Sequence, residues 1–181
     1  MIKKPLIKTK RLILRPFEAN DLETMHEYAS DIENTKYMIH LPNNSLNETA
    51  QFLQRVVTEW AKDSPKFYEF AIILDKKHIG AVSVYLNETR QEGELGWIIH
   101  KAYHSNGYAT EAAKEILEFA LKTLNVKKII AHCDYRNKTS IRVMQKIGLF
   151  LERDDGVRCY KDNNENIQEY MYSLIVNETV L

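Results

Sequence analysis

The chain of 181 residues carries 25 Lys and Arg against 25 Asp and Glu, so its formal net charge at pH 7 is zero. A balanced charge gives no general attraction to nucleic acid or to an anionic membrane surface. No apolar run approaches the roughly 20 residues that span a bilayer, and the start MIKKPLIKTKRL lacks the apolar core of a signal peptide. We therefore expect no nucleic acid or membrane partner and a cytoplasmic location.

The length is most simply that of one domain, spanning residues 1–181. The two cysteines, Cys133 and Cys159, have neither metal-ligand nor redox spacing, and we interpret each as a small core residue. The chain contains no H-E-x-x-H motif and no Cys/His cluster, so we expect no metal.

The first half of the chain predicts one strand, two helices and a hairpin. Residues 11–17 alternate as a strand, and Asn20 with Glu23 predicts the cap of a first helix. Ser45 to Glu48 is a capping box before a second helix, whose apolar face we expect to carry Phe52, Leu53, Val56, Val57 and Trp60. We expect these two helices to flank a cleft. The apolar runs 67–74 and 78–86, joined by Asp75-Lys76-Lys77, predict the hairpin.

The second half predicts a meander that runs into a parallel crossover. Residues 91–100 continue the meander, and 107–124 keep apolar residues at i, i+3 and i+4 spacing, which predicts a long helix. A strand at 128–133 follows, so strand, helix and strand should form one right-handed crossover. A second helix at 139–147 ends at Gly148, and strands at 149–152 and 167–176 complete the sheet.

Gly107, one of only 6 glycines, stands where the strand ending at His100 hands over to the long helix. Such a junction presents unpaired backbone N–H groups and the positive end of a helix dipole, which together favour phosphate. The signatures G-x-G-x-x-G and G-x-x-x-x-G-K-[ST] are both absent, which disfavours a dinucleotide fold and a P-loop. Taken alone, the junction is also explained by ordinary helix-start chemistry.

The segment His104-Ser105-Asn106-Gly107-Tyr108-Ala109, followed by Thr110-Glu111-Ala112, resembles the phosphate loop [Q/R]-x-x-G-x-[G/A] of the GNAT superfamily of N-acetyltransferases. The first position departs, because His104 stands where Gln or Arg is usual. The order of predicted elements is also similar to that family. The resemblance implies an α+β GNAT fold, with a mixed, mostly antiparallel central sheet, one parallel strand-helix-strand crossover and flanking helices. It further implies an enzyme that uses acetyl-CoA.

Two further segments narrow the resemblance. The opening TKRLILRPFEANDLETMHEYASD resembles the start of the Rim-type N-acetyltransferases, which modify the α-amino group of ribosomal proteins. Residues 137–140 with 144–149 resemble the N-x-x-S and K-x-G-F segment of that branch, although Leu149 replaces the usual Phe. Many other GNAT enzymes place a proton-donating Tyr seven residues after the Asn, a position that Met144 occupies here.

The resemblance also implies a coenzyme A site. The backbone of Ile98, Ile99 and His100 would pair with pantetheine as an added strand, and the side chain of Asn137 would hold the pantetheine amides. The pyrophosphate would lie on the N–H groups of Ser105, Asn106, Gly107, Tyr108, Ala109 and Thr110. The stripe Lys138, Arg142 and Lys146 either reaches the 3′-phosphate or forms a solvated helix face.

The reaction needs a proton donor for the leaving thiolate and a base for the amine. The resemblance makes Ser140 the candidate donor, and a Ser near a helix start is the alternative interpretation; for Asn137 the alternative is a helix cap. Glu94, in an otherwise apolar strand next to the cofactor segment, is the candidate base, and a half-exposed sheet position explains it equally well. Glu69 is the reserve. Cys159 falls near the position where some Rim-type enzymes place a Glu.

These considerations predict an N-acetyltransferase that moves an acetyl group from acetyl-CoA to a primary amine, with a protein N-terminal α-amine as the first choice of acceptor. An α-amine titrates near ~7.7 to 8.0 and a Lys amine near ~10.4, so an α-amine needs less help from a base. Two alternatives stay open. One is a small-molecule acetyltransferase acting on a polyamine, amino acid or antibiotic, and the other is a non-catalytic acyl-CoA-binding module. Either is compatible with a homodimer.

Overall fold

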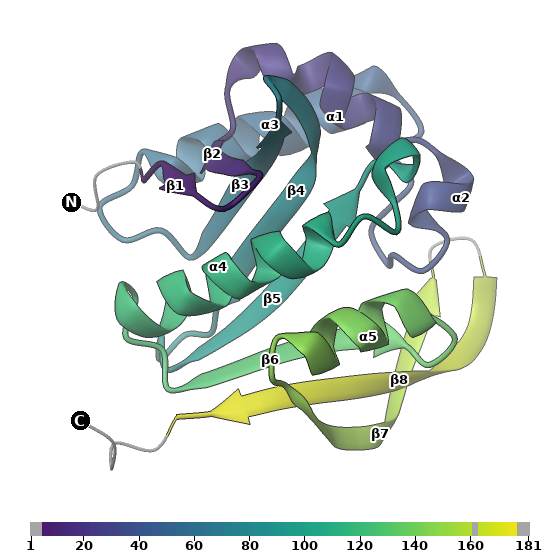
Figure 1. The fold of residues 1–181 in the computed structure, drawn as a ribbon. Helices are drawn as coiled ribbons and strands as arrows, with labels where there is room; N and C mark the ends of the chain where they lie inside the picture. The colour runs from purple at the N-terminus through teal and green to yellow at the C-terminus, as the bar shows by residue number, and fades with distance from the viewer. Residues whose placement is uncertain (1–4, 161–162, 177–181) are drawn as a thin grey trace.

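The computed structural model describes residues 5–160 and 163–176, and its strands form one eight-stranded sheet in the order β1-β2-β3-β4-β5-β6-β8-β7 (Figure 1). All neighbouring strands pair antiparallel except β5 and β6, which are parallel. The strands are β1 (Ile7–Lys8), β2 (Ile13–Pro16), β3 (Phe67–Leu74), β4 (Lys77–Leu86), β5 (Glu92–Ile99), β6 (Lys128–Asp134), β7 (Phe150–Tyr160) and β8 (Asn163–Ile175).

The helices flank this sheet, and α4 with the two strands around it forms the predicted parallel crossover. The predicted fold class, a mixed sheet with one such crossover, is confirmed. The α-helices are α1 (Leu22–Ala29), α2 (Ile32–Thr35), α3 (Leu46–Trp60), α4 (Tyr108–Lys122) and α5 (Lys138–Lys146), with short 3-10 turns at Ala19–Asp21 and Lys101–Tyr103. Within the described residues, none of these helices has the length and apolar character needed to cross a membrane.

The two faces of the sheet are covered by different helices. Figure 1 shows α4 lying across one face, where its Phe119 ring meets the rings of Tyr68 and Phe70. Successive side chains of a strand point to opposite faces, so Glu69 points to the other face. Residues of α1 and α3 lie on that second face. We call the two sides the α4 face and the α1 face.

The strands β5 and β6 stay together only briefly. Their pairing is limited to Glu92 with Lys128, Gly93 with Ile129 and Glu94 with Ile130. Beyond these residues β5 continues along β4 as far as Ile99, whereas β6 continues along β8 as far as Asp134. The two strands therefore diverge after Glu94 (Figure 1), and the edge of β5 that faces β6 lies open from Leu95 onward.

Several predicted details need correction. The first helix begins after its N-cap Asp21, and a capping box of Glu18 and Asp21 closes the 3-10 turn before it, so Asn20 is not the cap. The strand predicted at 149–152 extends to Tyr160, because register shifts let the charged edge strand β7 follow β8. Cys133 is buried as predicted, but Cys159 lies exposed on β7, where its thiol contacts the Asn166 side chain. The Ser45 cap is confirmed, since its Oγ accepts the N–H of Glu48 at 3.2 Å.

Candidate active site

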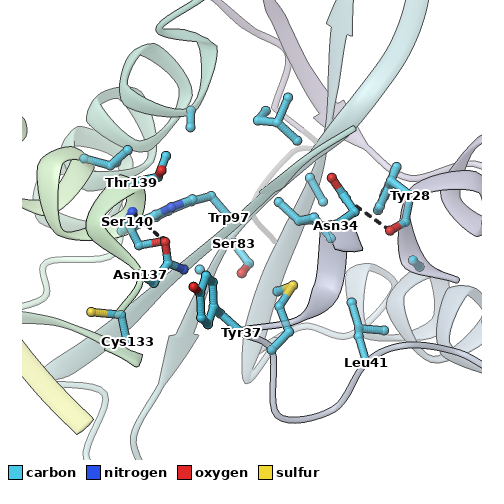
Figure 2. Close-up of a pocket in the computed structure, with 18 of the residues that line it drawn as sticks. Tyr28, Asn34, Tyr37, Leu41, Ser83, Trp97, Cys133, Asn137, Thr139 and Ser140 are labelled. Carbon is cyan, nitrogen blue, oxygen red and sulfur yellow. Dashed lines mark hydrogen bonds between the residues drawn. The ribbon is translucent and has the colours of Figure 1, made fainter. Parts of the chain in front are cut away.

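A cleft of about 1500 Å³ opens where β5 and β6 diverge (Figure 2). Its walls come from α1 and α3, from the connection between α2 and α3, from β4 and β5, and from the N-terminal ends of α4 and α5. The predicted pair of helices flanking a cleft, α1 and α3, is thus confirmed. In Figure 2 the side chains of Tyr37, Ser83, Trp97 and Asn137 surround the central opening.

The predicted phosphate loop lies at one end of this cleft. Gly107 is the N-cap of the 15-residue helix α4 and adopts φ 81°, a left-handed conformation that a residue with a Cβ atom adopts only with strain. Ser105 is also left-handed, with φ 64°. The backbone between them turns so that the N–H groups of the first helical turn are left without intrahelical partners. The predicted junction therefore has the form of an anion site.

Arg11 holds this loop in place, although nothing in the sequence pattern pointed to it. Its Nη1 donates to the carbonyl oxygen of Asn106 at 2.9 Å, across 95 residues of sequence. Its Nε pairs with Glu111 on the first turn of α4 at 2.7 Å, and its guanidinium lies 4.5 Å from the centre of the Tyr108 ring. The loop is thus tied to the segment that precedes β2.

His104, which departs from the family motif, has a contact within the chain. Its Nε2 lies 2.8 Å from the carbonyl oxygen of Ile99, so the imidazole connects the loop to the end of β5. The Asn106 side chain donates to the carbonyl of His104 at 2.9 Å, which stiffens the same turn. Both side chains therefore shape the loop.

The backbone groups predicted to contact pantetheine lie at the open end of β5. The N–H of His100 donates to the Ile79 carbonyl at 2.8 Å, and Ile99 is paired with Gly80. Because backbone groups alternate in direction along an antiparallel ladder, those of Ile98 point toward β4, as does the N–H of His100, whereas the His100 carbonyl accepts the N–H of Tyr103 at 2.9 Å. The groups of Ile99 and Trp97 point toward the gap. Of the three predicted residues, Ile99 presents its N–H to the opening, while its carbonyl contacts His104.

The N-terminus of α5 forms the opposite wall. Asn137 is its N-cap, and its side-chain oxygen accepts the N–H of Ser140 at 3.1 Å (Figure 2). The cap interpretation of Asn137 is confirmed, and the bond orients its amide nitrogen as the remaining donor. Ser140 lines the cleft. Met144 is fully buried, so the position that holds a Tyr in many relatives belongs to the core here.

Two carboxylates line the cleft on the α1 face. Glu94, with 49% of its side chain exposed, lies at the point where the strands diverge and accepts from Nδ1 of His132 at 2.8 Å. Glu69 is buried and accepts from the Tyr85 hydroxyl at 2.7 Å. Burial raises the pKa of Glu69 from 4.5 to about 7, against the opposing effect of hydrogen bonds from Tyr85 and Ser83. His132 had not been singled out from the sequence.

In the part of the chain that the structure describes, no group of three or more His, Cys, Asp or Glu is placed to hold a metal ion. The cleft offers a cradle for an anion, an open strand edge, a hydroxyl at a helix start and two carboxylates.

The family model described as "Acetyltransferase (GNAT) domain" matches residues 11–149. The chain belongs to the GNAT acetyltransferases. As such it is an acetyl-CoA-dependent N-acetyltransferase, and the predicted enzyme class is confirmed.

Individual relatives agree with this assignment. The chain is 35% identical over 176 residues to an uncharacterized N-acetyltransferase, YnaD, of Bacillus subtilis, which covers 95% of this chain and 98% of the relative. It is 25% identical over 140 residues to spermidine N(1)-acetyltransferase of Escherichia coli, covering 77% and 73% of the two chains.

Solved structures show the same fold. A GNAT-family acetyltransferase from Bacillus anthracis has 31% identity and a TM-score of 0.79, covering 94% of this chain and 98% of that one. The ribosomal L7/L12 α-N-protein acetyltransferase RimL, in complex with coenzyme A, has 15% identity and a TM-score of 0.81, covering 95% and 98%. At that identity the likeness to RimL concerns the fold alone.

Replacing Gly107 by Val should weaken coenzyme A binding by at least tenfold, about 1.4 kcal/mol. The left-handed backbone of the loop disfavours a β-branched residue, and a Cβ atom would come within 3.5 Å of the Arg11 guanidinium. Isothermal titration calorimetry with coenzyme A measures the effect. Gly148→Val is the matched control, because Gly148 is also left-handed, with φ 89°, but lies at the far end of α5. Equal affinities in the two variants would remove the loop from the site.

Replacing Glu69 by Gln should change how stability depends on pH. Between pH 4.5 and about 7 the folded protein retains the Glu69 proton that the unfolded chain releases, so wild-type stability falls as pH rises through this window. Gln has no such proton, and its stability relative to wild type should rise by about 3 kcal/mol from pH 4 to pH 8. Urea unfolding across this range, with the exposed Glu88→Gln as control, checks this. Parallel pH profiles for all three proteins would contradict it.

Proposed function

We propose that this enzyme acetylates the α-amine of a peptide N-terminus, as the Rim-type resemblance of its sequence suggests. The observation that carries the proposal is the arrangement of the cleft. It connects the anion cradle at the start of α4, through the gap between β5 and β6, with the two carboxylates on the α1 face. A donor held by its phosphates at one end would thus present its thioester to an amine at the other.

The donor would lie along the open strand edge. The N–H groups of residues 105–110 would hold the pyrophosphate of acetyl-CoA. The backbone of Trp97 and the N–H of Ile99 would pair with the pantetheine amides from one side, and the amide nitrogen of Asn137 would reach them from the other. The acetyl group would then lie near Glu94, where the gap closes.

The leaving group needs little assistance. A thiol with a pKa near ~8.5 departs as a thiolate that a single hydroxyl can protonate or hydrogen-bond. We assign that role to Ser140, whose position on the first turn of α5 is fixed by the Asn137 cap. The buried Met144 offers no proton, so Ser140 is the better-placed donor on this helix.

Charge in the cleft favours an acceptor with one amine over a polycation. Four acidic residues line it, and twice as many cationic residues outweigh them: Glu33, Glu48, Glu69 and Glu94 against Lys36, Arg55, Lys101, Arg136, Lys138, Arg142, Lys146 and Arg158. A polycation would gain more from an uncompensated acidic wall. The 25% identity to a spermidine acetyltransferase nevertheless makes a polyamine the second candidate acceptor.

A panel of acceptors tests the proposal directly. With acetyl-CoA as donor, we expect kcat/KM to be highest for a peptide with a free N-terminus. A peptide with a blocked N-terminus and one Lys should have a kcat/KM at least tenfold lower, because a far smaller fraction of its amine is neutral near pH 7. Thiol release and the product mass report the reaction. Highest activity on spermidine would support the second candidate, and tight coenzyme A binding without any turnover would indicate a non-catalytic module.

Replacing Ser140 by Ala should lower kcat by roughly 10²-fold with little change in the KM for acetyl-CoA, because a donor to the thiolate acts mainly in the transition state. Steady-state kinetics on the best acceptor gives both constants. Thr139→Ala, which removes a neighbouring hydroxyl from the same helical turn, is the matched control. Asn137→Ala should instead weaken coenzyme A binding. A wild-type kcat in Ser140→Ala would show that Ser140 serves only the helix start.

A further inference from the structure

His132 lies at the closed end of the gap between the diverging strands. It follows Ile130, the last residue of β6 that pairs with β5, by two positions, so its side chain returns to the same face of the sheet. Its Nδ1 is 2.8 Å from Oε1 of Glu94, and both side chains line the cleft. The pair thus spans the two strands at the place where the acetyl group would lie.

We propose that His132 is the base that removes the proton from the acceptor amine, and that Glu94 is the residue that positions it. This inference rests on the proposed function and assigns the proton transfer within it. It replaces Glu94 as the direct base with a carboxylate and imidazole acting as a unit.

The chemistry follows from the direction of the hydrogen bond. When Nδ1–H donates to the Glu94 carboxylate, the neutral ring carries its free lone pair on Nε2. As the amine nitrogen forms its bond to the acetyl carbon and the C–S bond breaks, the amine proton passes to Nε2, directly or through one water. The electron pair of the C–S bond leaves with sulfur, which Ser140 assists. Glu94 stays ionised and stabilises the imidazolium.

The surroundings of His132 suit this task. The charged groups that face it are Glu94 on β5, Glu169 on β8, and Arg153 and Arg158 on β7. The hydrogen bond to Glu94 raises the pKa of His132 above its ordinary value, with the charges of Glu94 and Glu169 adding to this and burial and Arg158 opposing it. A base of raised pKa is better matched to an α-amine near ~7.7 to 8.0.

Glu69 is the rival base, and its position is less direct. It lies on β3, two strands away from β5 across β4. Neighbouring strands are about 4.8 Å apart, so the Glu69 backbone is roughly 10 Å from that of β5. Its carboxylate is also engaged by the Tyr85 hydroxyl. His132 and Glu94, by contrast, border the gap itself.

The variant His132→Asn separates a catalytic from a structural role. The Asn amide can still donate to Glu94 from about the position of Nδ1, but it has no basic nitrogen. We expect kcat on the best α-amine acceptor to fall by about 10²-fold or more, while the KM for acetyl-CoA stays within about twofold of wild type. A purely structural pair would be preserved by this substitution and the rate with it.

The pH profile and an NMR titration supply the second readout. Glu94→Gln should lower the pKa of His132, because the ring loses its anionic partner. In a plot of kcat against pH, the rise that marks deprotonation of His132 should therefore move to lower pH. The maximal kcat should be at least tenfold lower than that of wild type. Titration of the His132 ring resonances, identified by their absence from His132→Asn, gives that pKa without turnover. The exposed Glu88→Gln, in the turn between β4 and β5, is the matched control and should move neither limb nor resonance.

The inference is overturned if His132→Asn retains most of the wild-type kcat and its pH limb while wild type acetylates amines, a result that leaves the proposed function standing. If only Glu69→Gln abolishes the rise of kcat with pH, the base is Glu69 and not His132. If wild type acetylates no amine of the panel, the proposed function fails and the inference with it. Should His132→Asn not fold, as judged by circular dichroism, an unshifted limb in Glu94→Gln overturns it.

Discussion

The site depends on the early separation of β5 from β6. Pairing between these strands ends at Glu94 and Ile130, and beyond these residues β5 stays paired only with β4 and β6 only with β8. Gly93 lies in this paired part and is closely packed: a Cβ atom there would come within 2.9 Å of the Val84 side chain and 3.5 Å of those of Ile129 and Val126. The open edge beyond this point supplies unpaired backbone groups, which an extended ligand can satisfy by adding itself as a strand.

Two arginines distant in sequence fix the walls of the cleft. Arg11 ties the loop before α4 to the N-terminal segment through Asn106 and Glu111. Arg158, buried on β7 and paired with Glu169, donates to the Tyr37 carbonyl at 2.9 Å across 121 residues of sequence. The first contact shapes the phosphate end and the second holds the connection that carries Tyr37 over the opening. Each guanidinium joins backbone to carboxylate, which its planar set of donors allows.

The sequence predicted the fold well because its signals are local. Helical spacing after Gly107 and the capping box at Ser45 both specify elements without reference to distant residues. The sequence could not predict contacts that form only between separate helices and strands. The register of β5 on β4 decides that the N–H of Ile99, and not that of Ile98 or His100, points to the gap. The pairing of His132 with Glu94 likewise exists only once β5 and β6 are neighbours, since 38 residues separate the two in the chain.

The charge of the cleft and the charge of an amine change over the same range of pH. Glu69, with its pKa raised to about 7, and His132, with its pKa also raised, both make the α1 face more negative as pH increases through neutrality. An α-ammonium group is attracted by that negative charge, yet it loses its own proton near ~7.7 to 8.0. Slightly above pH 7, the cleft can therefore both bind the α-ammonium group and provide a deprotonated base. A Lys amine stays protonated to about pH 10. It would bind as readily, but its deprotonation by the base would be far less favourable. That difference is the physical reason for proposing an α-amine as the acceptor.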